Sequence, residues 1–250
     1  MSLEIKNLYV NVKEKQVLKN LNLTINPGEI HVIMGPNGSG KTSLCLAIMG
    51  HPEYKIMNGE ILLDGEDIKN LPVNEKTKKG LFVAFQNPVV IPGLNIENFL
   101  RYSYNAVKNR KTENKGEELI SVLKFKKILN EKMKLFRIKK DIVKRNLNEG
   151  FSGGEKKKIE MLQLALLEPK YAFLDEIDSG LDLDSLKNIA DYIKKIVKES
   201  GLVIITHYQR FPKYIEPNYV HIIKDGEIVE TGDCSLIEEI EKKGYEKFNI

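Results

Sequence analysis

The segment that most constrains this chain is Gly35-Pro36-Asn37-Gly38-Ser39-Gly40-Lys41-Thr42. It satisfies the phosphate-binding template G-x-x-x-x-G-K-[ST] at every fixed position. The apolar residues 30–34 precede it and predict a buried strand, and apolar residues recur after it at helical spacing up to Gly50. Strand, glycine-rich loop and helix in that order are the context that the template requires.

The chemistry of such a loop follows from its backbone. Small residues let successive N–H groups point into one concavity, and the helix N-terminus adds its dipole. Lys41 would place a positive charge on the β- and γ-phosphates of a nucleotide, and the Thr42 hydroxyl is placed to bind Mg²⁺. We therefore expect residues 35–42, together with Ser43, to bind nucleotide phosphates.

Composition favours a soluble, core-forming protein. The chain has 250 residues, of which 42% are hydrophobic and 30% charged. It contains no apolar run near the roughly 20 residues of a membrane helix, and Met1-Ser2-Leu3-Glu4 does not begin a signal peptide. Cys45 and Cys234 lie far apart and form no ligand cluster. We expect a cytoplasmic protein that does not insert into a membrane.

Positive charge is concentrated in one part of the chain. Residues 101–150 hold 15 lysines and arginines against 6 aspartates and glutamates, whereas the whole chain carries a net charge of +4. Such a segment is either a solvated helical surface or a docking face for an acidic protein partner. Nucleic acid is disfavoured because aromatic residues are not interleaved with the basic ones.

Sequence patterns divide the chain into a core and an insert. Strand-like runs dominate up to residue 85, with a hairpin signal at Asp64-Gly65, and another hairpin is predicted at Asp225-Gly226. Residues 94–150 show helical periodicity and no strand pattern, with a polar linker at 109–116. We expect a single domain, residues 1–250, whose core comprises residues 1–86 and 151–250 and whose helical subdomain spans approximately residues 87–150.

Polar side chains stand at the ends of three further apolar strands. Gln86 follows residues 81–85, Asp175 and Glu176 follow residues 171–174, and His207 follows residues 202–206. Ligands of open α/β sheets bind at this edge. One carboxylate can hold Mg²⁺ while its neighbour meets an attacking water. A lone histidine is usually structural. His207, however, is the third case of a polar residue at the end of an apolar strand, which favours a functional role.

A second glycine turn, Ser152-Gly153-Gly154, precedes another predicted helix and is a further anion-binding candidate. Lys156, Lys157 and Lys158 fall in its first turn, where the helix dipole disfavours cations. They face either solvent, which is the default, or an acidic group. Residues 179–182, Ser-Gly-Leu-Asp, form a polar turn after the carboxylates.

These motifs, in this order, resemble those of the ATP-binding-cassette (ABC) ATPases over essentially the whole chain. The resemblance implies an α/β P-loop NTPase fold with a mixed core sheet, an N-terminal antiparallel β-subdomain and an inserted helical subdomain. The wording of several motifs is most similar to SufC, the ATPase of the SUF iron–sulfur cluster assembly system. Examples are residues 84–88, residues 150–157, which carry Glu155 where the family commonly has Gln, and residues 174–182.

The resemblance implies an ATPase, slow in isolation, in which two subunits hold ATP and Mg²⁺ between them in an ATP-dependent homodimer. The loop of one subunit and Ser152, Gly153 and Gly154 of the other would surround each nucleotide. Lys41, Gln86, Glu176 and His207 would be catalytic; Thr42, Gln86 and Asp175 would organise Mg²⁺; and Asp182 would sense the opposite site. The implied partner is a SufB/SufD-like scaffold protein.

Three questions stay open at the level of sequence. The aromatic residue that usually stacks on adenine would fall on Val12, so either adenine is held weakly or Tyr9 takes that place. A nucleotide-binding subunit of a membrane transporter would share every catalytic motif. A DNA-repair ATPase is disfavoured because residues 87–150 carry no sustained heptads, and a P-loop kinase because of the second glycine turn.

Overall fold

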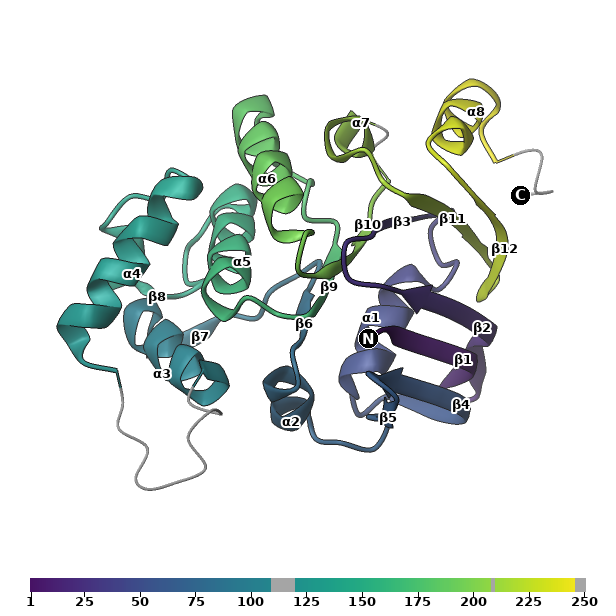
Figure 1. Ribbon diagram of the computed structural model, residues 1–250, viewed down its shortest axis with the longest axis horizontal. Coiled ribbons are helices and arrows are strands. Elements are labelled where there is room, and N and C mark those ends of the chain that lie inside the picture. The colour runs from purple at the N-terminus through teal and green to yellow at the C-terminus, as the bar shows by residue number, and fades with distance from the viewer. Residues whose placement is uncertain (109–119, 208–209, 246–250) are drawn as a thin grey trace.

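The computed structural model describes residues 1–108, 120–207 and 210–245. A central mixed sheet runs through the molecule in the order β12-β11-β3-β10-β9-β6, and an antiparallel sheet of order β2-β1-β4-β5 lies to one side of it (Figure 1). The central sheet comprises β3 (Ile30–Met34), β6 (Leu81–Ala84), β9 (Tyr171–Asp175), β10 (Gly201–Ile205), β11 (Tyr219–Lys224) and β12 (Glu227–Gly232). The antiparallel sheet comprises β1 (Leu3–Val12), β2 (Lys15–Ile25), β4 (Tyr54–Leu63) and β5 (Glu66–Asp67).

Helices cover the central sheet and form a group at one end of the molecule. The teal helices α3 and α4 lie farthest from the antiparallel sheet, with α5 between them and the central strands (Figure 1). The helices are α1 (Lys41–Met49), α2 (Val73–Lys78), α3 (Ile96–Lys108), α4 (Val122–Leu135), the 3₁₀ turn η2 (Ile142–Lys144), α5 (Gly153–Leu167), α6 (Leu183–Ile196), α7 (Arg210–Ile215) and α8 (Ser235–Lys243).

The insert contains a small sheet that its sequence pattern did not indicate. β7 (Ile91–Asn95) pairs antiparallel with β8 (Asn146–Leu147) and joins the two ends of the insert. The expectation that strands are absent from residues 94–150 was therefore wrong. The reason is that a strand of two residues is too short to show a period. The predicted polar linker at 109–116 lies outside the described residues.

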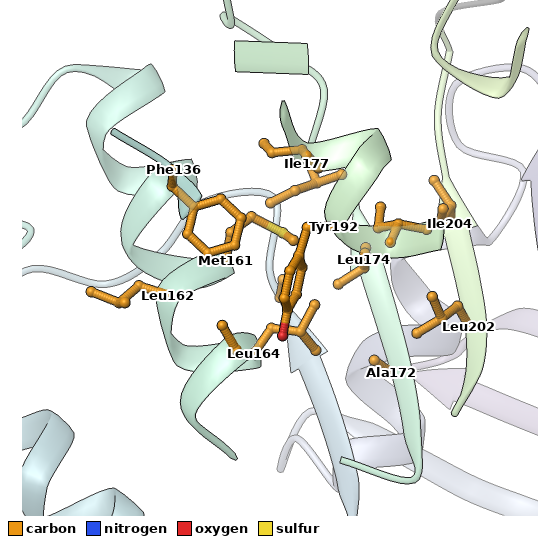
Figure 2. Packing of buried hydrophobic residues seen from close by; sticks show 14 of the residues in the cluster. Phe136, Met161, Leu162, Leu164, Ala172, Leu174, Ile177, Tyr192, Leu202 and Ile204 are labelled. Carbon is orange, nitrogen blue, oxygen red and sulfur yellow. The ribbon is translucent and has the colours of Figure 1, made fainter. Parts of the chain in front are cut away.

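Alternation along the central strands divides the core into two clusters. Leu202 and Ile204 of β10 face the helices α4, α5 and α6, while Val203 and Ile205 face α1 and the antiparallel sheet. Figure 2 shows part of the first cluster, with side chains from α5, α6, β9 and β10. Within it, the rings of Phe136 and Tyr192 meet edge to face at 5.1 Å. Because both faces are covered, the central strands are largely apolar, and the polar groups of the site concentrate at their ends.

The strand order places the predicted functional residues together. The strands β3, β10, β9 and β6 are adjacent and mutually parallel, so their carboxyl ends lie along one edge. The phosphate-binding loop follows β3, Gln86 follows β6, Asp175 ends β9, and His207 follows β10. One edge of one sheet therefore carries all four segments.

Candidate functional site

The loop after β3 is closely supported on the side away from the sheet edge. A Cβ atom at Gly35 would lie 2.2 Å from the carbonyl oxygen of Ile223, so only glycine fits there. The backbone N–H of Gly226, in the β11–β12 turn, donates to the carbonyl of Ser39 at 2.9 Å. The predicted Asp-Gly hairpin thus braces the phosphate-binding loop, which positions its backbone before any ligand binds.

Lys41 lies inside this loop. Its ammonium donates to the carbonyl oxygens of Gly35 and Pro36, at 2.9 and 2.8 Å. The side chain is buried, and burial lowers the pKa of Lys41 to about 8, against the opposing charges of Glu176 and Asp175. A cation held at this place by neutral carbonyls is available to an anionic ligand.

Residues of four strand ends line one cavity of about 300 Å³ at this edge. Its lining includes six of the loop and helix residues predicted to bind nucleotide, of which Lys41 is also predicted to be catalytic, and the other three predicted catalytic residues. They are Asn37, Gly38, Gly40, Lys41, Thr42 and Ser43 together with Gln86, Glu176 and His207. The structure therefore brings together residues that lie 170 positions apart at the extremes, between Asn37 and His207.

Glu176 is the centre of a short polar chain. The side-chain amide of Gln86 donates to Glu176 Oε2 at 2.7 Å, and His207 Nε2 lies 3.2 Å from Glu176 Oε1. The backbone N–H of Glu176 donates to the carbonyl of Ile205 at 2.9 Å, which ties the end of β9 to the end of β10. Both carboxylate oxygens are thereby directed by neighbouring strand ends.

The two adjacent carboxylates point to different places, as strand alternation predicts. Asp175 is fully buried, whereas the side chain of Glu176 is 17% exposed and lines the cavity. Glu176 adopts the left-handed backbone region with φ 50°, which ends the strand abruptly. A non-glycine residue in this conformation is uncommon, and here it turns the Glu176 side chain toward the cavity.

The surroundings of Asp175 and His207 shift their pKa values in opposite directions. Burial raises the pKa of Asp175, and the Thr42 hydroxyl and the nearby lysines oppose the rise. Burial and the charge of Lys41 lower the pKa of His207, which Glu176 partly offsets. The histidine is consequently neutral at pH 7, since both dominant effects disfavour its charged form.

Asp175 has the properties of a cation ligand. Both of its carboxylate oxygens are buried and make no well-formed hydrogen bond. Buried carboxylate oxygens need a partner, and a hard cation beside Thr42 would supply one. Across residues 1–108, 120–207 and 210–245, no group of three or more histidine, cysteine, aspartate or glutamate side chains could hold a metal by itself. An Mg²⁺ ion here would therefore complete its shell with hydroxyl, amide, phosphate and water oxygens.

The second glycine turn begins α5 with a capping box. The Ser152 hydroxyl accepts from the Glu155 N–H at 3.3 Å, and Glu155 Oε2 accepts from the Ser152 N–H at 2.9 Å. This explains the glutamate that departs from the usual motif, because an acidic residue at this position satisfies an N–H and complements the helix dipole. Asp182 likewise caps α6 by accepting from the Ser185 N–H at 2.7 Å.

The capped turns lie away from the cavity and next to each other. Ser152, Gly153, Gly154 and Asp182 are not among the described residues that line it. A Cβ atom at Gly154 would instead lie 3.3 Å from the carbonyl oxygen of Gly180. The predicted site residues therefore fall into two groups in one subunit: the loop and strand-end residues, most of which line the cavity, and the turns at residues 152–154 and 179–182.

Lys157 and Glu160 of α5 were not predicted as site residues. Of the two alternatives left open for the three lysines, solvent was wrong for Lys157, whose side chain is only 4% exposed and whose ammonium lies 3.6 Å from the acidic Glu160. Its ammonium donates to the backbone carbonyls of Phe85 and Gln86, each at 3.0 Å. A run of three lysines does not show which member faces inward, and only the packing of α5 on the sheet decides it.

Neither Tyr9 nor Val12 lines the described part of the cavity, so the predicted adenine contact of Tyr9 stays a prediction. Both residues lie on β1, where they are partly exposed. The loop side of the cavity approaches the antiparallel sheet at Gly40, whose Cβ position is 2.9 Å from Leu18 of β2.

A comparison with known families agrees with the geometry. The family model described as ABC transporter matches residues 18–179, which is more than half of the chain. The chain belongs to the ABC transporter family. With the loop, the strand-end carboxylates and the second glycine turn in the order of this family, the protein is an ABC ATPase that hydrolyses ATP.

Curated relatives match this ABC ATPase along nearly all of their length. A probable ATP-dependent transporter, ycf16, of Trieres chinensis is 48% identical over 98% of this chain and 96% of its own. A probable ABC transporter ATP-binding protein of Streptococcus pyogenes serotype M3 is 50% identical over 97% of this chain and 93% of its own.

Solved structures confirm the predicted fold. The ATP-binding subunit of an ABC transporter has a TM-score of 0.79 and 22% identity, covering 97% of this chain and 94% of its own. A dimeric ATP-binding cassette in a post-hydrolysis state with ADP and Pi has a TM-score of 0.75 and 24% identity, covering 94% and 99%. In the part of this ABC ATPase that the structure describes, no helix is both long and apolar enough to cross a membrane.

Proposed function

We propose that this ABC ATPase is the cytoplasmic, ATP-hydrolysing subunit of a SUF-type iron–sulfur cluster assembly complex. It dimerises around ATP and drives a conformational change in a SufB/SufD-like scaffold. The wording of its motifs at residues 84–88, 150–157 and 174–182 supports this assignment. The ATPase chemistry and the identity of the partner rest on separate observations.

The observation that carries the dimer is the separation of the site residues into two groups. The cavity holds the phosphate-binding loop, while Ser152, Gly153 and Gly154 lie elsewhere beside Gly180. A helix N-terminus can bind an anion, and this exposed one does not face its own loop, so it is available to phosphates held by another subunit. A second subunit arranged head to tail supplies them. A solved cassette with this fold is a dimer bound to ADP and Pi.

Within one subunit the cavity residues divide the chemistry of hydrolysis. Lys41 turns from its carbonyl partners to the β- and γ-phosphates and stabilises the charge that develops on the transferred group. Glu176 orients and polarises the attacking water, because its oxygens lie at the cavity and its strand end is fixed. His207 holds the γ-phosphate and this water from the other side of Glu176.

Magnesium fits the residues between the loop and β9. Thr42 and Asp175 would hold the ion, Asp175 directly or through water, and the side chain of Gln86 would complete the set. When bound, the ion supplies charge neutralisation at the β- and γ-phosphates. Because the Asp175 oxygens lack well-formed hydrogen bonds, binding the ion would not require Asp175 to break strong existing interactions.

The partner surface is proposed to lie next to Gln86. Val89, Val90 and Ile91 follow it within five residues, with 74%, 42% and 41% of their surfaces exposed. Consecutive exposed apolar residues on a protein surface indicate a binding site. Lysines on the exposed side of α4, such as Lys124 and Lys127, add positive charge to the surface of the same subdomain. Exposed apolar residues and a basic helix within one subdomain fit an acidic protein with an apolar contact site.

The alternative function is the nucleotide-binding subunit of a membrane transporter. The names of the curated relatives, which describe transporters and their ATP-binding proteins, favour it. The cavity chemistry would be unchanged, and the membrane subunit would be a separate chain docking on the same exposed residues. The two functions therefore differ in the partner and not in the ATP site.

Purification of the tagged protein from both cytosolic and membrane fractions of its native cells tests the partner. A matched variant with Val89→Asp and Ile91→Asp serves as the control, since both side chains are exposed and outside the cavity. A soluble scaffold identified by mass spectrometry with the wild type, and lost with the variant, supports the cluster-assembly function. A multi-span membrane protein in its place would establish the transporter alternative.

A further inference from the structure

Two buried charges of α5 lie directly behind the catalytic edge of the sheet. Glu160 Oε1 accepts a hydrogen bond from the backbone N–H of Phe85 at 2.9 Å. Lys157 donates to the carbonyls of Phe85 and Gln86, each at 3.0 Å, and to the carbonyl of Asp175 at 3.3 Å. The end of β6 is therefore bound from both its donor and its acceptor sides by one helix.

The two charged groups also form a pair. Lys157 Nζ lies 3.6 Å from Glu160 Oε2, and their side chains are 4% and 6% exposed. Glu160 Oε2 is buried and accepts no well-formed hydrogen bond. Burying an ion pair against backbone is costly, and apolar residues of similar size are often as stable or more so. The pair therefore does something at this place that its contribution to stability does not account for.

We propose that Lys157 and Glu160 are positioning residues that fix the backbone at the end of β6 and so hold Gln86 against Glu176. Gln86 is the last residue of the bound segment, since its carbonyl accepts from Lys157, and its side chain reaches Glu176 at 2.7 Å. A side chain that must contact both a carboxylate and a metal ion needs a fixed backbone. Gln86 lies beyond the end of β6 at Ala84, so strand pairing does not hold it. The pairing of β6 with β9 ends at Ala84, and hydrogen bonds from the α5 side chains hold the backbone of Phe85 and Gln86 instead.

The same helix begins at the Ser152-Gly153-Gly154 turn. Lys157 lies one turn into α5 and Glu160 about one turn further. A displacement of the N-terminus of α5 would thus be transmitted to Gln86 of the same subunit through a rigid helix. This inference rests on the roles proposed for Gln86 and for the second glycine turn.

Charge also distinguishes the pair from an ordinary core contact. Burial raises the pKa of Glu160 to about 7, while the charge of Lys157 opposes the rise. The other titratable groups near the pair are Asp175 and, through the same strand ends, Asp178 and Glu176. The hydrogen bond to the Phe85 N–H is stronger when Glu160 is ionised.

Two variants of the full-length protein test the proposal. Glu160→Gln keeps the shape and the acceptor for Phe85 but removes the charge beside Lys157. The double variant Lys157→Met with Glu160→Met replaces the pair by apolar residues of similar length, so it folds even if the single variant does not. Glu168→Gln is the matched control, because it makes the same chemical change at the other end of α5, where Glu168 pairs with Lys108 and Lys132.

The measurements are kcat, the Mg²⁺ concentration for half-maximal rate, ATP binding and the melting temperature. We expect the double variant to lose about 10- to 100-fold in kcat or in apparent Mg²⁺ affinity, as is typical when supporting groups around a metal site are removed. ATP binding and the melting temperature should stay close to those of the wild type. In addition, a variant combining these changes with Gln86→Ala should be no slower than Gln86→Ala alone, because all three residues act through Gln86.

The outcomes separate this inference from the proposed function. Wild-type kcat and Mg²⁺ dependence in the double variant, with Gln86→Ala impaired, would overturn the positioning role alone. Additive losses in the combined variant would overturn it as well, since the pair would then act elsewhere. Wild-type turnover of Gln86→Ala would remove the role proposed for Gln86 and this inference with it.

Discussion

The side-chain amide of Gln86 donates to the carboxylate of Glu176 at 2.7 Å, across two adjacent parallel strands that are 90 residues apart in the sequence. The opposite oxygen of the same carboxylate lies 3.2 Å from His207 Nε2, at the end of a third strand. Glu176 is thus oriented before ATP binds, and any ligand that recruits Gln86 or His207 acts on it directly.

Replacement of Glu176 tests its proposed role toward water. Glu176→Gln keeps the size of the side chain but removes the charge that polarises water, so ATP should bind normally while hydrolysis falls by at least ~10²-fold. Phosphate release and equilibrium nucleotide binding measure the two effects. Glu199→Gln, an exposed carboxylate near the end of α6, is the matched control. Turnover of Glu176→Gln at the wild-type rate would refute the assignment.

The buried ammonium of Lys41 predicts proton uptake on ATP binding. Its pKa is lowered to about 8 by burial, so part of the population is neutral at pH 8. Phosphate at this place favours the charged form and raises the pKa. The affinity for ATP should therefore fall as the pH rises above about 8, by up to roughly tenfold per unit.

Calorimetric titrations of ATP at pH 8, in buffers that differ in ionisation enthalpy, measure this proton uptake. We expect the observed binding heat to depend on the buffer, and the dependence to disappear in Lys41→Arg, because arginine stays protonated. Binding heats that are the same in every buffer for the wild type would contradict the prediction.

The separated glycine turn predicts that hydrolysis needs a second subunit. Ser152→Arg places a long cation at the N-terminus of α5, where it also removes the capping hydroxyl. We expect turnover to be abolished while the isolated subunit still binds ATP, because Ser152 does not line the loop cavity. Sedimentation should show a monomer without nucleotide, with slow turnover.

The control for this experiment is the Glu176→Gln background, in which ATP should persist and dimers accumulate. Adding Ser152→Arg to it should return the protein to monomers with ATP still bound. Loss of ATP binding caused by Ser152→Arg, or a stable dimer of the wild type without nucleotide, would count against the composite site.

A buried histidine chain predicts acid sensitivity far from the ATP site. Glu29, His31, His221 and Thr231 are linked in series, with 2.9 Å between His31 Nδ1 and His221 Nε2. Burial, reinforced by His31, lowers the pKa of His221 to about 4 from its ordinary value of 6.5. A histidine whose pKa is lower in the folded state contributes stability above its unfolded pKa and loses it as the pH falls toward the folded pKa.

As the pH falls from 6.5 to about 4, protonation of His221 should therefore lower the free energy of unfolding by up to ~3 kcal/mol, at 1.36 kcal/mol per pKa unit. Urea unfolding at pH 7.0, 6.0 and 5.0 measures the loss. His221→Phe should flatten the pH dependence, whereas replacing the exposed His51 should not. An equally steep loss of stability in His221→Phe would show that other groups are responsible.

Much of the candidate site could be predicted because its motifs are local. The phosphate-binding loop needs eight consecutive residues with a strand before and a helix after, and each part has its own pattern. Gln86, Asp175, Glu176 and His207 were found because each ends an apolar strand, and adjacent parallel strands end at one edge. Their convergence required only that the strands be neighbours.

The remaining features depend on which side of an element faces another. The run of three lysines in α5 gave no sign that Lys157 is buried, because helix packing selects one face among residues of equal polarity. The β7–β8 pair was not predicted because two-residue strands carry no period. Glu155 stood out only as a departure from a motif, and its capping role is visible only in the geometry of Ser152.

The sequence by itself determined the phosphate-binding chemistry, the order of strands and helices around it, and the residues available for catalysis, because backbone propensity and strand alternation act over a few neighbouring positions. Only the tertiary structure decided that Glu176 is held between Gln86 and His207, that the Ser152 turn lies apart from the loop, and that Lys157 and Glu160 lie beneath the site. These relationships join segments separated by tens of residues, and they arise from the packing of helices on both faces of the central sheet.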